Sequence, residues 1–276
     1  MRFANVEFNG LVRSARIEGE VANLLFAEPI SAGFDFSALR ESASEKSVPT
    51  TDLRFLAPVV DPRKVICLGL NFKSHVEEAG RDLPDYPVFF TKFAESIIGP
   101  YEDIIVPPES QKVDYEAELA VVIGKHARRV KAQDALDVIA GYTVANDVSM
   151  RDYQSKSHQW LQGKAWPRST PLGPWFVTAD ELGDASGLEI RLELDGVELQ
   201  RAKTNLMIFD VPTTIAALSE FVELQPGDVI LMGTPGGVGF KREPPEYLTP
   251  GRRVRVEVEG IGAIENVVVA EDVSGS

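Results

Sequence analysis

The sequence predicts an α+β fold in which short strands predominate and a small β-rich unit comes first. Most apolar runs are short and end at Gly, Pro or Asn-Gly turns, and few stretches carry the apolar spacing of a helix. At the N-terminus, apolar runs over residues 3–8, 11–17 and 21–26 are separated by Asn9-Gly10 and Gly19. This pattern is typical of a meander of short strands.

A linker is expected to end the N-terminal unit. Residues 41–48 are mostly polar, and Pro49 and Pro58 follow them. Prolines and polar residues disfavour regular structure at this point. We therefore expect a small N-terminal domain over residues 1–60 and a catalytic domain over residues 61–276.

The larger part of the chain is expected to alternate strands with a few short helices. Apolar runs predict strands, the spacing of apolar residues and caps predicts helices, and Asp195-Gly196 predicts a hairpin turn of type I′. The expected strands cover 64–70, 118–123, 142–148, 188–194, 197–200, 229–232, 252–259 and 264–269. The expected helices cover 71–81, 132–140, with Leu136 and Ile139 inward, and 212–221, capped by Asp210.

The composition excludes several classes of protein. The net charge of −14 argues against nucleic acid or an anionic membrane as the partner. The first seven residues lack the apolar segment of a signal peptide, and no run of about 18 apolar residues spans a membrane. The single cysteine, Cys67, lies in an apolar run and is expected to be a buried, inert thiol. These features together predict a cytoplasmic protein.

Two acids open the apolar run expected to be the strand 118–123. Glu116 and Glu118 are two residues apart, so their side chains point to one face with Cα atoms about 6–7 Å apart. A third acid, Asp147, ends the run over 142–148. Like charges this close repel unless a positive charge lies between them, and an all-oxygen set suits Mg²⁺, Mn²⁺ or Ca²⁺. The alternative is a structural network with Arg151 or with lysines.

These acids lie in a series of motifs that resembles the fumarylacetoacetate hydrolase family. The resemblance extends over residues from about 64 to 270 and is loose before that. The motifs, in order, are DYEAEL at 114–119, NDVSMRD at 146–152, QGK at 162–164, PLGP at 171–174, DVP at 210–212 and GTPGGVG at 233–239. The fold implied is a mixed β-sandwich roll, and because family members generally form homodimers, a homodimer is expected.

The resemblance also implies roles for particular residues. It makes Glu116, Glu118 and Asp147 the ligands of a divalent metal that chelates a 2-oxo acid. Lys164 would then bind an oxygen of the substrate and stabilise an enolate as its charge develops. Gln154 and Thr234 match positions that contact substrate.

The glycine-rich segment 233–239, which holds Thr234, has two readings. Glycines let a backbone approach a ligand closely, so its N–H groups are candidates for binding an oxyanion. The alternative is a tight turn.

His75 and Glu78 form a candidate catalytic pair. They are three residues apart and share a face if residues 71–81 are helical. A carboxylate in this position orients an imidazole so that it takes a proton from water. Hydrolytic and decarboxylating relatives carry a His-x-x-Glu pair on a segment that orders over substrate. Of the other histidines, His126 is expected to be exposed, and His158 is a candidate for the pocket.

The function we expect is metal-dependent hydrolysis of a C–C bond in a 2,4-dioxo acid of the acylpyruvate or fumarylpyruvate type, through a pyruvate enolate. Two alternatives in the same family are oxaloacetate decarboxylation and isomerisation of 2-hydroxyhepta-2,4-diene-1,7-dioate, a step of aromatic catabolism. The distal pocket would separate them, with Arg13, Tyr86, His158 and Trp160 as candidates. Outside the family, a non-catalytic metal-binding protein and a Mg²⁺ enzyme of phosphate compounds are the remaining alternatives.

Overall fold

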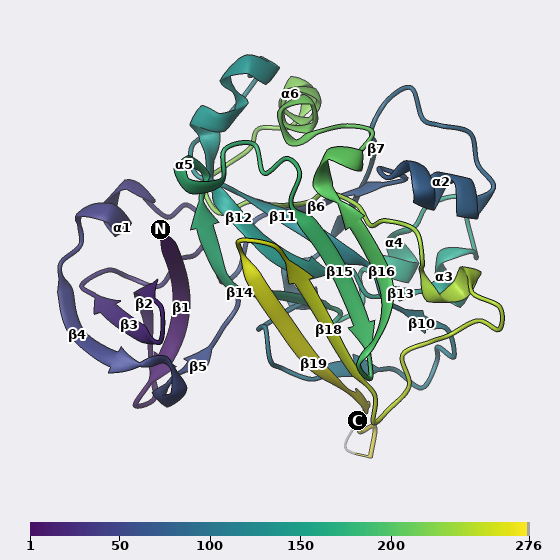
Figure 1. Ribbon diagram of the computed structural model, residues 1–276, viewed down its shortest axis with the longest axis horizontal. Coiled ribbons are helices and arrows are strands. Elements are labelled where there is room, and N and C mark those ends of the chain that lie inside the picture. The colour runs from purple at the N-terminus through teal and green to yellow at the C-terminus, as the bar shows by residue number, and fades with distance from the viewer. Residues whose placement is uncertain (275–276) are drawn as a thin grey trace.

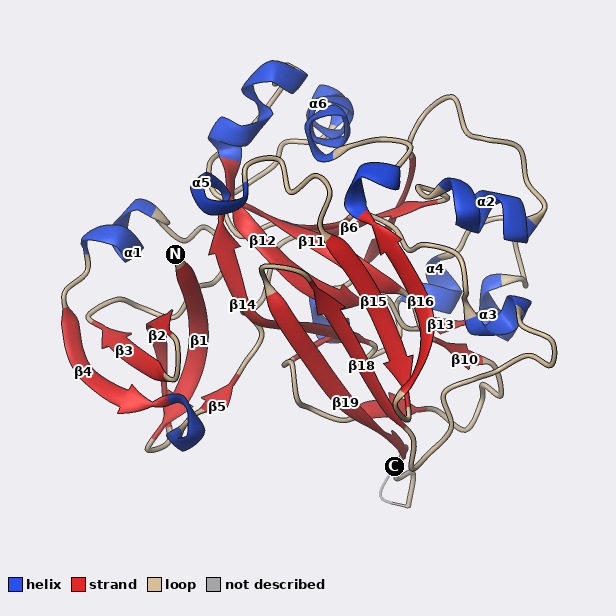
Figure 2. Ribbon diagram, in the orientation of Figure 1, coloured by secondary structure: helices blue, strands red, loops and turns tan. Residues whose placement is uncertain are grey.

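The computed structural model describes residues 1–274. Strands predominate, in a 12-stranded mixed sheet, a five-stranded sheet and a two-stranded ladder (Figures 1 and 2). The helices are short and gather at the ends of the strands. The α+β prediction is therefore confirmed.

The N-terminal strands form an antiparallel meander at the left of Figure 1. They are β1 (Arg2–Phe8), β2 (Leu11–Glu18), β3 (Val21–Leu25), β4 (Ser44–Pro49) and β5 (Arg54–Phe55). Asn9 and Gly10 have φ of 53° and 77°, the left-handed values that a tight hairpin turn needs. β1 also pairs with β14 (Thr170–Thr178), so the meander continues the large sheet. The domain boundary near residue 60 stays a prediction.

The centre of the large sheet carries the site. Its remaining strands are β6 (Val65–Gly69), β7 (Val88–Lys92), β8 (Ile97–Ile98), β11 (Ala117–Ile123), β12 (Ile139–Asn146) and β17 (Val229–Leu231). β11 is buried along its whole length. Leu119 and Val121 belong to one core cluster, and Ala120 and Val122 belong to a second. Because β11 is covered on both faces, its sequence is a continuous apolar run.

A five-stranded sheet packs against this centre through the core cluster that contains Leu119 and Val121. Its strands are β9 (Ile104–Val106), β15 (Glu189–Leu194), β16 (Val197–Lys203), β18 (Arg253–Val258) and β19 (Gly262–Ala270). Asp195 and Gly196 have φ of 53° and 80°, which confirms the expected hairpin. The two-stranded ladder joins β10 (Val113–Asp114) to β13 (Ser149–Met150) beside the site.

The helices are α1 (Ser37–Glu41), α2 (Lys73–Ala79), α3 (Arg151–Gln154), α4 (Leu161–Lys164), α5 (Ala179–Leu182) and α6 (Val211–Phe221). The 3-10 turns cover Thr50–Asp52, Ala94–Ser96, Ala132–Val138, Thr204–Leu206 and Gly239–Lys241. α6 begins as predicted, because Asp210 accepts a hydrogen bond from Thr213 N at 2.8 Å. No helix within residues 1–274 is long and apolar enough to cross a membrane.

The α-helix predicted over residues 132–140 does not form, so this prediction is wrong. The chain forms a 3-10 turn over Ala132–Val138, and Ile139 already belongs to β12, where it lies opposite Ile123. Leu136 is 38% exposed and does not point into the core. Ile139, the last apolar residue of the predicted helical pattern, therefore pairs with β11 in the sheet and is not part of a helix.

Candidate active site

A cavity of about 720 Å³ opens where α2, α3 and α4 meet the ends of β10 and β11, at the right of Figure 1. Its buried lining residues include Glu116, Lys164, Arg151, His75 and Thr234. Five of the eight predicted site residues therefore line one cavity: His75, Glu116, Gln154, Lys164 and Thr234. Pockets of this size are typical of small-molecule sites.

The three acids converge because β11 and β12 are antiparallel neighbours. Ala117 lies opposite Asn146, so the acids on either side of this pair face each other across the ladder. The amide of Asp147 donates to the carbonyl of Glu116 at 2.9 Å and fixes this register. Carboxylate oxygens of Glu116, Glu118 and Asp147 lie within 4.8 Å of one another, and all three residues are buried. The cluster is compatible with a divalent metal ion.

Lys164 lies between two of the acids, Glu116 and Asp147. Its Nζ donates to Glu116 Oε2 at 2.6 Å and to Asp147 Oδ2 at 2.7 Å. Burial lowers the pKa of Lys164, but the charges of Asp147 and Glu116 outweigh burial and raise it to about 12. Lys164 is therefore a buried ammonium group at the floor of the cavity.

Gly163 explains how Lys164 reaches this position. A Cβ atom at Gly163 would lie 2.5 Å from Cβ of Gln154, closer than packed side chains approach. Glycine thus allows α4 to contact α3 directly. The contact brings Lys164 and Gln154 to the same cavity.

Sequence reasoning missed Lys92, a second buried ammonium group. Lys92 lies at the end of β7, and its side chain has no exposed area. Its Nζ donates to Asp147 Oδ1 at 2.8 Å, to the carbonyl of Val148 at 3.0 Å and to the carbonyl of Ser169 at 3.2 Å. Both oxygens of Asp147 therefore accept from lysines. The sequence shows a lysine at the end of an apolar run, which could have marked Lys92 as a candidate. No nearby residue indicates that its partner is Asp147, which lies 55 residues away in sequence.

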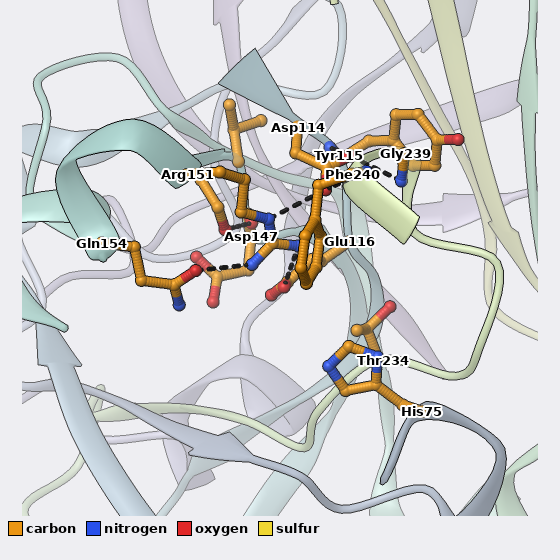
Figure 3. A network of polar contacts seen from close by, with 12 residues as sticks. His75, Asp114, Tyr115, Glu116, Asp147, Arg151, Gln154, Thr234, Gly239 and Phe240 are labelled. Carbon is orange, nitrogen blue, oxygen red and sulfur yellow. Dashed lines mark hydrogen bonds and ion pairs between the residues drawn. The ribbon is translucent and has the colours of Figure 1, made fainter. Parts of the chain in front are cut away.

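Arg151 connects two of the buried acids to Gln154 (Figure 3). Its guanidinium group donates to Asp114 Oδ2 at 2.8 Å, to Glu116 Oε1 at 2.6 Å and to Gln154 Oε1 at 2.9 Å. The ring of Phe240 covers it, 4.4 Å from the guanidinium carbon. The sequence offered Arg151 only as a candidate structural partner of the acids. Arg151 does pair with Glu116, and it also lines the cavity.

The charges of this cluster do not balance. Within residues 1–274, the carboxylates of Asp114, Glu116, Glu118 and Asp147 are buried together with three cations, Lys92, Lys164 and Arg151. Within the described chain, Glu118 has no cationic partner and accepts from the amide of Gly233 at 2.6 Å.

The pKa values of the acids follow from this imbalance. Burial raises the pKa of Glu118 well above its ordinary value, and the charges of Asp147 and Glu116 raise it further. Burial also acts on Glu116, but Lys164 and Arg151 outweigh it and lower the pKa of that carboxyl. One positive charge is thus missing beside Glu118, which an oxygen-preferring divalent ion fits.

His75 and Glu78 form the pair expected from their spacing. α2 carries both, and His75 Nδ1 lies 2.8 Å from Glu78 Oε1. The other oxygen of Glu78 accepts from the amide of Gly237 at 2.8 Å. His75 is only 8% exposed and lines the cavity, where Figure 3 draws its ring near Thr234. Glu78 thus orients the imidazole and also anchors α2 to the glycine-rich segment.

Of the two readings of the glycine-rich segment, ligand binding by its amides is not favoured, because four of these amides donate to groups of the protein itself. The amides of Gly233, Gly236, Gly237 and Gly239 donate to Glu118, Ser74, Glu78 and Asp114 respectively. The segment is therefore a clamp that holds carboxylates of the site, and the protein's own acids take the role expected of an oxyanion. Thr234 lines the cavity, and its Oγ1 accepts from Gln200 at 2.9 Å.

The candidates for the distal pocket divide into two groups. His158 and Trp160 line the cavity. Arg13 and Tyr86 do not line it. Arg13 belongs to β2, and its guanidinium group lies 3.7 Å from a carboxylate oxygen of Glu45. The ring of Tyr86 packs against that of Phe89. His126 is exposed as expected.

Comparison with known proteins assigns most of the chain to a family. Residues 64–269 match the model of the fumarylacetoacetate hydrolase C-terminal family. "Oxaloacetate tautomerase Fahd2a, mitochondrial" of Rattus norvegicus is 48% identical over 223 residues, which cover 80% of this chain and 71% of the rat protein. The Homo sapiens protein FAHD2A, also named a mitochondrial oxaloacetate tautomerase, is 47% identical over 224 residues, with the same two shares covered.

Solved structures with three different activity names share the fold over nearly the whole chain. The 5-carboxymethyl-2-hydroxymuconate delta-isomerase of Mycobacterium smegmatis is 36% identical with a TM-score of 0.84, covering 98% of this chain and 100% of its own. The 2-hydroxyhepta-2,4-diene-1,7-dioate isomerase of Mycobacterium marinum is 36% identical with a TM-score of 0.84, covering 100% of both. The maleylpyruvate hydrolase of Sphingobium sp. SYK-6 is 27% identical with a TM-score of 0.79, covering 98% and 100%.

Proposed function

Because the chain belongs to the fumarylacetoacetate hydrolase family, we propose that it is a divalent-metal-dependent enzyme that converts the enol and keto forms of a 2-oxo dicarboxylic acid. Oxaloacetate is the first substrate to test. The names of relatives at 47–48% identity support this reaction over the others. The reaction is balanced without a second reactant, since the enol loses a proton from oxygen and gains one at C3.

One observation carries the proposal, the excess negative charge of the buried cluster. Four carboxylates meet three cations there, so a divalent ion would leave the cluster with a single positive charge. A floor with this charge suits the carboxylate and enolate oxygens of a 2-oxo acid. When bound, the ion would hold the 2-oxo acid and stabilise the negative charge that develops on its oxygen.

The residues of the cavity floor would divide the remaining tasks. Lys164 would donate to the enolate oxygen, since it is a protonated amine already aimed at the acids. Gln154, held by Arg151, and Thr234, held by Gln200, would orient the carboxylate end. His75, oriented by Glu78, would move the proton to or from C3.

The test follows the ultraviolet absorbance of the oxaloacetate enol as it disappears, with Mg²⁺ or Mn²⁺ and then with EDTA. We expect conversion that depends on the protein and stops in EDTA. His126→Ala is the matched control, because this histidine is exposed and lies outside the lining. An enol that decays at its spontaneous rate in the presence of the metal-loaded protein would refute the proposal.

We propose hydrolysis of a 2,4-dioxo acid as the second candidate, because the His75–Glu78 pair is suited to activate water. Water would add its hydroxyl group to the C4 carbonyl, the C3–C4 bond would break, and the pyruvate enolate would take up a proton. Metal-dependent release of pyruvate from acetylpyruvate would support hydrolysis. Release of pyruvate from oxaloacetate would instead indicate a decarboxylase, and conversion of 2-hydroxyhepta-2,4-diene-1,7-dioate would indicate an isomerase.

We also propose that the enzyme is a cytoplasmic homodimer, as its sequence and the family resemblance imply. β7 ends the large sheet, and Phe93, one residue after it, is 51% exposed. An open sheet edge with apolar neighbours is a common site of association. Sedimentation equilibrium would test the assembly, and a monomer at micromolar concentration would contradict it.

A further inference from the structure

The mouth of the cavity differs in charge from its floor. The lining residues Arg81, Lys112, Ser157 and His158 are exposed, whereas Glu116, Arg151 and Lys164 are buried. Burial therefore distinguishes a floor, which includes the metal-ligand candidate Glu116, from a rim with two permanently positive side chains, Arg81 and Lys112.

Backbone hydrogen bonds fix the positions of the two rim residues, Arg81 and Lys112, and their side chains form no ion pairs within residues 1–274. The amide of Arg81 donates to the carbonyl of Val76 at 3.1 Å, directly after α2, and the carbonyl of Lys112 accepts from the amide of Arg151 at 2.9 Å. Neither side chain forms an ion pair or a hydrogen bond with any residue from 1 to 274. Both charges are consequently available to a ligand.

Among the described lining residues, the one acid besides the buried Glu116 is the half-buried Asp152, which is already engaged. Its carboxylate accepts from Ser110 Oγ at 2.7 Å and from the amide of Gln111 at 3.1 Å. With Arg81 and Lys112 the rim keeps one positive charge in excess, in a protein whose net charge is −14. Such a local reversal of sign attracts anions to the cavity that the rest of the surface repels.

We infer that Arg81 and Lys112 bind the second carboxylate of a dicarboxylic 2-oxo acid and make the enzyme selective for diacids over monoacids. This inference rests on the proposed function, which places the 2-oxo acid end at the floor. The ligand is a dianion whose far carboxylate reaches the rim. Because the cavity measures about 720 Å³, chains longer than the four carbons of oxaloacetate also fit.

The test measures binding of two five-carbon acids to the Mg²⁺-loaded protein by calorimetry. 2-Oxoglutarate has the second carboxylate, and 2-oxopentanoate lacks it. We expect the wild-type protein to prefer the diacid. Arg81→Met and Lys112→Met should each reduce this preference about three- to tenfold, as expected for one charged contact in a partly exposed site, and leave binding of the monoacid unchanged.

Two further variants keep the result specific. Arg81→Lys retains the charge and should retain most of the preference. Lys73→Met removes a charge from α2 outside the lining, where Lys73 lies 3.7 Å from Glu77, and should leave the preference intact.

The outcomes separate the inference from the proposed function. A wild-type protein that binds both acids equally, or variants that keep the wild-type preference, would overturn the inference and leave the 2-oxo acid site standing. A protein that binds neither acid in Mg²⁺ would overturn both.

Discussion

At the scale of single residues, the site is a buried ionic cluster in which each acid has a different set of partners. Glu116 has Lys164 and Arg151, Asp147 has Lys164 and Lys92, and Glu118 has a backbone amide. Because the partners differ, substitution of each cation should affect stability and activity differently.

Lys92→Met should destabilise the fold more in the absence of metal than in its presence. The variant leaves Asp147 with one cation fewer in a buried site, which costs about 3–5 kcal/mol, and a bound divalent ion would return part of the lost charge. Urea unfolding with and without Mg²⁺ measures the difference. Lys64→Met is the control, since Lys64 pairs with the buried Asp228 at 2.9 Å and its loss should not respond to Mg²⁺.

Lys164→Met should reduce turnover about 10²–10³-fold and leave Mg²⁺ affinity equal or higher. The substitution removes the donor proposed for the enolate oxygen and also a cation that competes for Glu116 and Asp147. Steady-state kinetics and Mn²⁺ titration together check this. A variant that fails to bind metal would show that Lys164 organises the acids and would contradict the assigned role. Lys156→Met, outside the lining, is the matched control.

Local patterns could predict some of these residues but not others. Glu116, Glu118 and Asp147 follow from strand periodicity and strand ends, and His75 with Glu78 follows from helical spacing. Lys92 and Asp114 act through partners 55 and 37 residues away in sequence, at Asp147 and Arg151. Such pairings depend on which strands become neighbours, and periodicity carries no information on that.

At the scale of elements, the glycine-rich segment and α2 form one unit with the acids. Two hydrogen bonds join them, from the amide of Gly236 to Ser74 Oγ at 3.1 Å and from the amide of Gly237 to Glu78. The amides of Gly239 and Phe240 hold Asp114 on the other side. Displacing this segment would therefore disturb both the candidate base and the acid cluster.

Gly239→Ala should disrupt the site. A Cβ atom there would lie 1.8 Å from the carbonyl oxygen of Glu246 and 2.5 Å from Asp114 Oδ1, so the backbone must shift. We expect loss of activity and a marked fall in melting temperature, measured by thermal unfolding.

Gly251→Ala is the comparison for that experiment. This glycine has φ of +94° and no atom near its Cβ position, so alanine there costs only the left-handed strain of about 1–2 kcal/mol. Gly239 is not among the glycines with positive φ, so its substitution carries no left-handed strain. Equal effects of the two substitutions would show that crowding at Asp114 and Glu246 costs no more than the strain at Gly251, and would contradict the prediction.

Elements were predicted best where their signals are local. The hairpin at Asp195-Gly196 and the start of α6 at Asp210 match the structure. The stretch 132–140 was wrong because Ile139 pairs with Ile123 in the sheet, a tertiary contact that overrides helical spacing. The glycine-rich segment was placed correctly, but its amides serve partners that only the fold brings near.

At the scale of the whole molecule, the N-terminal strands and the central strands share one sheet and one of the core clusters. Phe3 and Phe176 lie 5.7 Å apart between ring centroids, and Leu25 and Leu39 belong to the same buried cluster as Leu231. The α+β class was predictable from composition and pattern, whereas the continuity of the sheet depends on the pairing of β1 with β14.

The chain should consequently unfold in a single cooperative transition. Removing the first 60 residues would uncover Phe176 and leave an edge of β14 unpaired, so the two parts stabilise each other. Differential scanning calorimetry tests this. Two separate transitions, with Mg²⁺ raising the temperature of only the second, would show that the parts are energetically independent.

The ladder between β11 and β12 has a consequence for how this enzyme could evolve. The metal-ligand candidates are set by main-chain pairing in the centre of the sheet, whereas Arg81, Lys112 and His158 stand on connecting segments at the surface. If Arg81 and Lys112 select the acid as proposed, substitutions at the rim would change which acid is accepted and leave the pairing of β11 with β12 intact. Exposed positions on connecting segments would then be the places where a lineage with this ladder changes its substrate.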